Sequence, residues 1–172
     1  TVGEIYGRRL MKPVRNASSH LYLPGGHKGV WNAGGLRGRR EWLLCEAAMD
    51  ALSLYVHGFE GVTWSYGVKC FSPDHWALVR ECKPDRVTIC YDNDEPGNAA
   101  ANGLAQELEA IGIEAWRATL PPQSDINDVV RGEKDAKAAL ASIFASAYRL
   151  LPAAPAPQPA SGESKPIIPL AV

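Results

Sequence analysis

The sequence predicts an α/β domain in which a mostly parallel sheet is flanked by helices. Between residues 41 and 151, short apolar runs of strand length alternate with amphipathic segments of helix length. Such alternation is typical of right-handed β-α-β crossovers, which place helices over both faces of one sheet. With 172 residues, of which 46% are apolar and 22% are charged, the chain is long enough for one domain with its own core.

The expected elements follow from these patterns and from their start and stop signals. Two short strands are expected at residues 4–10 and 20–23, ahead of a glycine-rich, irregular stretch at 24–38. Further strands are expected at 41–46, 61–67, 86–92 and 113–120. Helices are expected at 47–58, 72–83 and 96–112, and helical sequence again follows the loop at 121–128 to about residue 151. Ser72 followed by Pro73 marks a helix start, and Gly58 and Gly112 mark helix ends.

Composition divides the chain into three parts. Residues 1–40 form a basic N-terminal segment that contains the short strands, and residues 41–151 form the α/β domain. Residues 152–172 begin with a Pro/Ala-rich stretch that has too little apolar bulk to form a core, so we expect a disordered linker. Because the chain begins at Thr1 without a methionine, we expect it to be an excerpt of a longer protein.

Positive charge is concentrated at the start of the chain. Residues 1–41, the basic flank, hold eight Lys or Arg against two Glu, whereas the rest holds 10 basic against 17 acidic residues. A basic surface with aromatic residues among its cations can hold a phosphate backbone and stack bases. We therefore expect Arg8, Arg9, Lys28 and Trp31 to bind nucleic acid. The alternative is a solvated surface whose charge offsets an acidic domain.

Other features narrow the class of protein. No apolar run approaches the roughly 18 residues of a membrane span, and no leader segment opens the chain, so we expect a cytoplasmic protein without a membrane partner. The four cysteines show no zinc-site spacing and are expected to be reduced thiols.

Acidic residues gather where the predicted strands end. Glu46 ends the strand at 41–46, Asp92 and Asp94 end the strand at 86–92, and the loop after the strand at 113–120 offers two more carboxylates. Ligands of open parallel sheets bind beyond the carboxyl ends of the strands. Asp50 lies one helical turn after Glu46 and faces the same edge. We call this expected cluster the carboxylate rim: Glu46, Asp50, Asp92, Asp94, Asp125 and Asp128.

A divalent cation would relieve the repulsion among these carboxylates. Hard oxygen ligands in this number suit Mg²⁺ or Mn²⁺. Each residue also has an ordinary explanation, since Asp94 and Asp125 could cap the helices that follow them, and Glu46 and Asp50 could form a plain helix start. The joint position of all six at strand ends favours the metal site.

Four segments of the sequence resemble the Toprim domain: "LLCEAAMDALSL" (43–54), "TWSYG" (63–67), "SPDHWALV" (72–79) and "ICYDNDEPGNAA" (89–100). Among Toprim proteins they look like the DnaG-type bacterial primases. The upstream segments "GEIYGRRL" (3–10) and "HLYLPGGHKGVWN" (20–32) are similar to the sequence that precedes Toprim in those primases. The resemblance spans roughly residues 3–132 and is strongest at 43–101.

The resemblance implies specific roles for the acidic residues. Glu46, Asp92 and Asp94 would be catalytic and would hold the metal with Asp125, and Asp50 would lie alongside. Two divalent ions are implied. Asn127 departs from the family pattern, which has a second acidic residue there, so a second ion would be held more weakly or by Asp128.

The function implied is that of a primase catalytic core. Such a core makes short primers on a single-stranded DNA template from ribonucleoside triphosphates, by metal-dependent nucleotidyl transfer. A helicase or other replication protein is an implied partner, as is a zinc-binding module upstream or in a separate chain, and the fragment is expected to need other domains for full activity. Two alternatives stay open: a Toprim nuclease that cleaves phosphodiesters, and a non-catalytic module that binds metal or nucleic acid.

Overall fold

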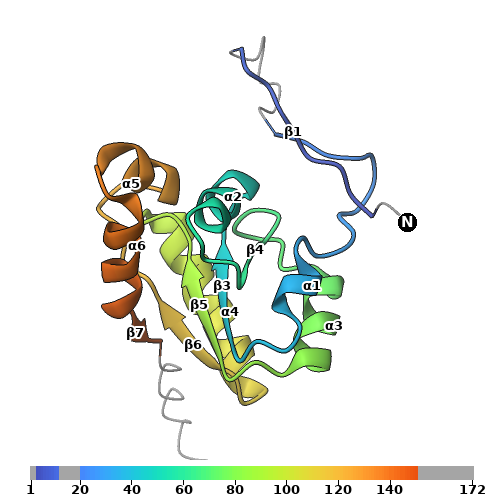
Figure 1. Ribbon diagram of the computed structural model, residues 1–172. Coiled ribbons are helices and arrows are strands. Elements are labelled where there is room, and N and C mark those ends of the chain that lie inside the picture. The colour runs from blue at the N-terminus through green and yellow to red at the C-terminus, as the bar shows by residue number, and fades with distance from the viewer. Residues whose placement is uncertain (1–2, 12–19, 151–172) are drawn as a thin grey trace, which may run out of the picture.

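The computed structural model describes residues 3–11 and 20–150, which form a small two-stranded sheet and a larger α/β domain (Figure 1). The small sheet pairs β1 (Gly7–Arg8) with β2 (His20–Leu21) in antiparallel fashion and extends away from the domain. The domain has a five-stranded sheet made of β3 (Glu41–Cys45), β4 (Val62–Trp64), β5 (Arg86–Cys90), β6 (Glu114–Arg117) and β7 (Tyr148–Arg149). The predicted α/β class is confirmed.

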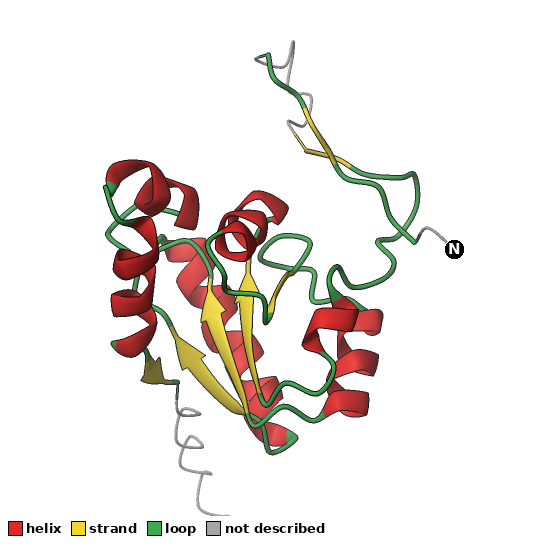
Figure 2. Ribbon diagram, in the orientation of Figure 1, coloured by secondary structure: helices red, strands yellow, loops and turns green. Residues whose placement is uncertain are grey.

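The sheet topology brings several strand ends to one edge. The strand order is β4-β3-β5-β6-β7, and all neighbours are parallel except β6 and β7. Cys45 at the end of β3 pairs with both Trp64 of β4 and Cys90 of β5. The arrowheads of β3 and β5 in Figure 2 accordingly point toward the same edge, near α2 and α5.

Helices cover both faces of this sheet. The described helices are α1 (Ala33–Leu36), α2 (Ala48–Val56), α3 (Pro73–Cys82), α4 (Glu95–Ala110), α5 (Ile126–Gly132) and α6 (Ala136–Ala145). Residues of α1, α3 and α4 share one apolar core with strand residues such as Leu44 and Ile89. Residues of α2, α5 and α6 share a second core with Cys45 and Cys90. Side chains that alternate along β3 and β5 therefore enter opposite cores.

The predicted start of α3 is confirmed in atomic detail. Ser72 is the N-cap, its hydroxyl accepts from the backbone N–H of His75, and Pro73 occupies the first turn. His75 completes the cap, because its Nδ1 accepts from the backbone N–H of Ser72 at 3.2 Å. Its Nε2 donates to the Trp64 carbonyl at 2.8 Å, so this buried ring ties α3 to β4.

The region after residue 125 differs from the prediction of one continuous helical stretch. The helix α5 ends at Gly132, and a new helix, α6, begins at Ala136. Asp135 caps α6 by accepting from the backbone N–H of Ala138. After α6 it returns as β7, which Arg149 fixes through ion pairs with Glu109 and Glu114, both at 2.9 Å. Both partners lie outside this region, so its own periodicity could not indicate the strand. The short helix α1 likewise lies in the stretch predicted to be irregular.

Several predictions fall on residues outside the described ranges. The predicted linker at 152–172 lies outside them. So do Lys12 and Arg15, two of the eight cations of the basic flank. All four cysteines, which lie within the described part, are free, as expected. Among residues 3–11 and 20–150, none of the helices has the length and apolar character that a membrane crossing requires.

Candidate metal centre and nucleic-acid surface

The ends of β3 and β5 position the first carboxylates of the rim. Glu46 directly follows β3, and Asp92 lies two residues beyond β5. Asp94 caps α4, with Oδ1 accepting from the backbone N–H of Gly97 at 2.8 Å. A Cβ on Gly97 would lie 2.3 Å from the Asp92 carbonyl oxygen, so only glycine allows α4 to begin this close to Asp92. The capping alternative for Asp94 is therefore real, and it occupies one of its two oxygens.

Arg117 of β6 holds the chain around Asp92 in place. Its side chain is only 3% exposed. The guanidinium donates to the carbonyl oxygens of Tyr91 at 2.7 Å and Asp92 at 3.0 Å, and to Oδ1 of Asn98 at 2.8 Å. The sequence did not lead us to predict a role for Arg117. A lone arginine inside the apolar strand "IEAWRATL" was the available signal, because a buried guanidinium requires several acceptors.

Asp50 is the buried member of the rim and takes part in a polar contact between α2 and α5. It is 4% exposed, and its Oδ1 accepts from Nδ2 of Asn127 at 2.6 Å. The Asn127 oxygen in turn accepts from the hydroxyl of Ser53 at 2.5 Å. The residue that departs from the family pattern is thus the hydrogen-bond donor to a buried carboxylate.

Asp125 and Asp128 form a capping box at the start of α5. Oδ1 of Asp125 accepts from the backbone N–H of Asp128 at 2.7 Å, which is the ordinary role considered for Asp125. Both residues nevertheless line an open pocket of about 310 Å³ together with other acidic residues of the rim. Its lining consists of Asp92, Asp94, Gln123, Ser124, Asp125 and Asp128. Four of the six predicted residues therefore share one pocket.

The rim is electrostatically strained. Burial, together with the charges of Asp92 and Asp94, raises the pKa of Glu46 to about 7. Burial and the charge of Asp125 raise the pKa of Asp50 to about 7 and that of Asp92 to about 6. Each shift means that the negative form is disfavoured by its surroundings. The six side chains thus act on one another although they come from three separate segments.

The donor set fits a hard divalent cation. Oε2 of Glu46 is buried and has no hydrogen-bond partner, so it is an unused acceptor beside two other carboxylates. Oxygen ligands and a surplus of negative charge are what Mg²⁺ and Mn²⁺ require. Within the described ranges, no three His, Cys, Asp or Glu side chains are close enough to hold one ion as they stand. Binding through three carboxylates would therefore require side chains to turn.

The basic flank serves two purposes. Arg37, Arg39 and Arg40 form ion pairs with acidic residues of the domain, namely Glu81, Glu60 and Asp85. This part of the flank offsets domain charge, which was the alternative explanation. Arg8, Arg9 and Lys28 have exposed side chains. Trp31 packs against Trp64, with ring centroids 4.9 Å apart.

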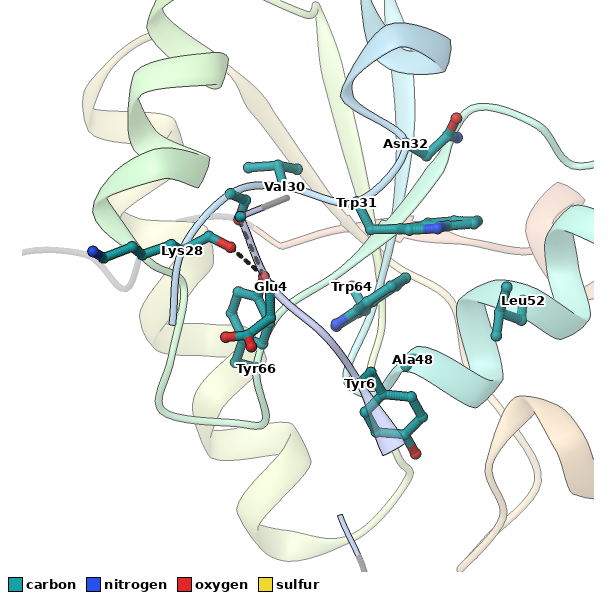
Figure 3. A pocket seen from close by; sticks show the side chains of 12 residues that line it. Glu4, Tyr6, Lys28, Val30, Trp31, Asn32, Ala48, Leu52, Trp64 and Tyr66 are labelled. Atoms are coloured by element: carbon teal, nitrogen blue, oxygen red, sulfur yellow. Dashed lines mark hydrogen bonds between the residues drawn. The ribbon is translucent and has the colours of Figure 1, made fainter. Parts of the chain in front are cut away.

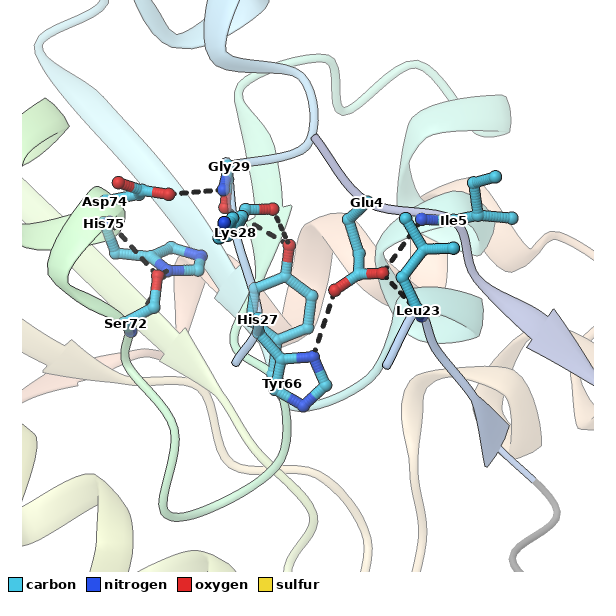
Figure 4. A network of polar contacts seen from close by, with 10 residues as sticks. All are labelled: Glu4, Ile5, Leu23, His27, Lys28, Gly29, Tyr66, Ser72, Asp74 and His75. Atoms are coloured by element: carbon cyan, nitrogen blue, oxygen red, sulfur yellow. Dashed lines mark hydrogen bonds and ion pairs between the residues drawn. The ribbon is translucent and has the colours of Figure 1, made fainter. Parts of the chain in front are cut away.

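Polar contacts join the two parts of the flank to each other and tie the flank to the domain (Figure 4). The Glu4 carboxylate accepts from the backbone N–H of Leu23 at 2.9 Å and contacts the His27 ring at 3.2 Å. The Tyr66 hydroxyl donates to the Lys28 carbonyl at 3.0 Å, and Asp74 accepts from the backbone N–H of Gly29. Residues far apart in the sequence thereby place Lys28 beside the start of α3.

A family model described as Toprim-like matches residues 43–130, just over half of the chain. The chain belongs to the Toprim-like family. The matched residues of this Toprim-like domain include every member of the carboxylate rim.

Two curated DNA primases are similar to part of this chain. The one from Geobacillus stearothermophilus is 33% identical over 96 residues, and the one from Campylobacter jejuni is 29% identical over 99 residues. The matches cover 56% and 58% of this chain but only 16% of each primase. The chain thus corresponds to a small part of the relatives' length.

Solved structures show the same fold. The Aquifex aeolicus primase, comprising zinc-binding and RNA polymerase domains, has a TM-score of 0.70 at 19% identity, with 87% of this chain and 38% of that one covered. A DnaG primase catalytic domain bound to single-stranded DNA has a TM-score of 0.67 at 24% identity, with 84% and 47% covered. The predicted resemblance to the Toprim domain of DnaG-type primases is confirmed.

Proposed function

We propose that this chain is the catalytic Toprim part of a primase-type nucleotidyltransferase that makes short RNA primers on single-stranded DNA. The observation that carries the proposal is the carboxylate rim, in which Glu46 has an unused buried oxygen beside Asp92 and Asp94. The similarity to two curated DNA primases supports the reaction class.

In this proposal, Glu46, Asp92 and Asp94 hold the first divalent ion, and Asp125 and Asp128 contribute to a second. Bound Mg²⁺ or Mn²⁺ would stabilise the charge on phosphate oxygens and align the triphosphate with a primer 3′-hydroxyl. Asp50, which accepts from Asn127, adds buried negative charge to the rim. Arg117 keeps the peptide units around Asp92 fixed, so that the carboxylates return to one arrangement after each turnover.

The template would lie along the basic flank. Arg8, Arg9 and Lys28 are exposed cations, and Tyr66 anchors the Lys28 segment to the domain. Phosphate contacts need only such charges. A structural relative is described as bound to single-stranded DNA. A helicase or replication partner, a zinc-binding module in another part of the protein, and action in the cytoplasm belong to the same proposal.

The extent of structural similarity favours synthesis over cleavage. The matches to primases cover 84–87% of this chain, which is more than the Toprim-like residues 43–130. A shared Toprim domain alone would fit a nuclease equally well, but the additional segment is common to the primases. At these identities the similarity concerns the fold, so activity requires a direct test.

The test is a primer-synthesis assay on single-stranded DNA with labelled ribonucleotides and Mg²⁺ or Mn²⁺. The proposal expects short labelled products that disappear with Asp92→Asn and persist with Glu107→Gln, an exposed carboxylate in the C-terminal half of α4. Binding of a labelled ribonucleoside triphosphate is measured in parallel and should depend on metal and on Asp92. Cleavage of the template without synthesis would establish a nuclease instead. Absence of metal-dependent triphosphate binding would overturn the proposal.

A further inference from the structure

A second pocket, of about 540 Å³, lies where the basic flank meets the domain (Figure 3). Its walls are aromatic: Tyr6 comes from the N-terminal segment, Trp31 precedes α1, and Trp64 and Tyr66 lie at the end of β4. Ala48 and Leu52 of α2 contribute to the lining. We call this site the aromatic pocket. None of the rim carboxylates lines it.

The pocket walls are held in place by ring contacts. Trp31 meets Trp64 at a tilt of 31° and Tyr55 edge-on at 74°. Tyr66 stacks on His27, with centroids 4.3 Å apart and an interplanar angle of 7°. Its hydroxyl is also bonded to the Lys28 carbonyl. A planar ligand would therefore meet surfaces that are already ordered, which lowers the entropic cost of binding.

Trp64 carries a donor that the protein leaves unused. Its side chain is 7% exposed, and its indole N–H has no hydrogen-bond partner. By contrast, the indole N–H of Trp42 donates to the Leu36 carbonyl and that of Trp116 donates to Glu114. Figure 3 shows the Trp64 nitrogen at the end of the ring nearest Tyr66 and the N-terminal segment. A buried donor without a partner is costly, and an acceptor from a ligand would satisfy it.

These features select a ligand class. An aliphatic chain would fill the pocket but leave the Trp64 donor unpaired. A bare phosphate would find aromatic walls and the Glu4 carboxylate rather than a cluster of cations. A nucleobase offers both a flat face for stacking and acceptor atoms on its edge. Lys28, at the exposed margin, can meet the phosphate joined to that base.

We infer that the aromatic pocket binds one nucleobase of the single-stranded DNA template, with its edge accepting from the Trp64 indole N–H. The inference rests on the proposed function and adds a defined contact to it. Ala48 begins α2 two residues after Glu46, so a base held here lies one short segment from the carboxylate rim. The pocket thereby fixes one template position relative to the metal-binding carboxylates. A nucleobase could also come from a free nucleotide, and the experiment separates the two sources.

The experiment compares a short single-stranded oligonucleotide with a matched abasic oligomer, using fluorescence anisotropy on the 172-residue chain. The intact oligomer should bind more tightly, roughly fivefold or more, because stacking requires the base. Trp64→Phe keeps a ring but removes the donor and should lose roughly three- to tenfold of that base-dependent affinity. Trp116→Phe is the control, since that indole already has a partner, and it should bind like wild type.

A cavity-filling variant guards against loss of folding. Leu52→Trp adds bulk to the pocket while leaving Trp31 and Trp64 unsubstituted, and it should abolish the difference between the two oligomers. Equal binding of intact and abasic DNA by wild type, with a normal salt dependence, would overturn the inference while the proposed template binding survives. No binding of either oligomer would overturn both. The last arm uses deoxythymidine monophosphate. If it binds in the pocket and the oligomer cannot displace it, the pocket belongs to a free nucleotide, which would contradict the template assignment.

Discussion

The side-chain amide of Asn127 donates to Oδ1 of Asp50 at 2.6 Å, although 77 residues separate them. The contact links α5 to α2 and places a neutral donor where the resemblance leads one to expect a second acidic residue. Because the pKa of Asp50 is already raised to about 7 by burial and by Asp125, a carboxylate at 127 would add to the same conflict. Asn127 therefore stabilises the metal-free rim at the expense of one potential metal ligand.

Replacing this amide by an acid should reverse that balance. We expect Asn127→Asp to lower the free energy of unfolding of the metal-free protein by about 1–3 kcal/mol, since it leaves a buried carboxylate facing another one. Mg²⁺ should then raise the thermal midpoint more in the variant than in wild type. Asn102→Asp, which adds the same charge at an exposed position of α4, is the control. Equal effects of the two substitutions would contradict this role for Asn127.

Arg117 should act as a positioning residue for Asp92. Arg117→Lys keeps the charge but loses the planar fork that reaches two carbonyls at once. We expect a loss of about 1–3 kcal/mol in the free energy of unfolding and weaker Mn²⁺ binding in calorimetry. Arg131→Lys, an exposed arginine of α5, should change neither. Unchanged Mn²⁺ affinity in a folded Arg117→Lys protein would remove the positioning role.

The fold was largely predictable because its signals are local. Alternating strand and helix periods, the Ser72 cap and the glycine helix ends each lie within a few residues, and the structure confirms the parallel sheet and its helices. The two-residue strand β7 was not predicted, because the ion pairs that hold it in place join Arg149 to Glu109 and Glu114, which are distant in sequence. The helix α1 was not predicted either, because it has only four residues and no side-chain cap to mark its start.

The gathering of acidic residues at one edge of the sheet was predictable from the sequence, but the surroundings of each residue were not. Strand ends mark the carboxylates, because the edge of a parallel sheet gathers them, and four of six line one pocket. The burial of Asp50 and its bond to Asn127 depend on how α2 packs against α5, which no local pattern encodes. The sequence also could not predict the role of Arg117 or the unpaired indole N–H of Trp64. Both depend on which acceptors lie nearby in the folded protein.

His75 should make stability depend on pH. Burial lowers its pKa from the ordinary 6.5, and its Nε2 donates to the Trp64 carbonyl, so the folded protein holds the neutral ring. Below pH 6.5 the unfolded chain takes up a proton that the folded chain resists, and stability falls. The advantage of wild type over His75→Asn in urea unfolding should therefore be largest above pH 6.5 and shrink at lower pH. A constant or growing advantage on acidification would show that the folded state accepts the proton.

The basic flank should give DNA binding a steep salt dependence. The log–log slope should be about −0.7 per phosphate neutralised, and replacing Arg8, Arg9 and Lys28 by Gln should make it shallower by about that amount for each phosphate that is no longer neutralised. The matched control replaces Arg37, Arg39 and Arg40, which are paired with domain carboxylates. Chelation should also weaken binding, since the uncovered carboxylate rim repels the strand. If binding is insensitive to salt, or if the control substitutions lower the affinity more, the flank only balances the charge of the domain and does not bind DNA.

Titration of the metal-free protein with Mn²⁺ in a calorimeter tests the carboxylate rim most directly. The wild type should bind with measurable heat and gain thermal stability. The reason is that the bound ion offsets both the burial and the repulsion that raise the pKa values of Glu46 and Asp92. The double variant Asp92→Asn with Asp94→Asn should fold but lose most of that binding and gain, and Glu107→Gln should retain both. Equal Mn²⁺ binding and stabilisation in wild type and in the double variant would show that the rim is not the metal site.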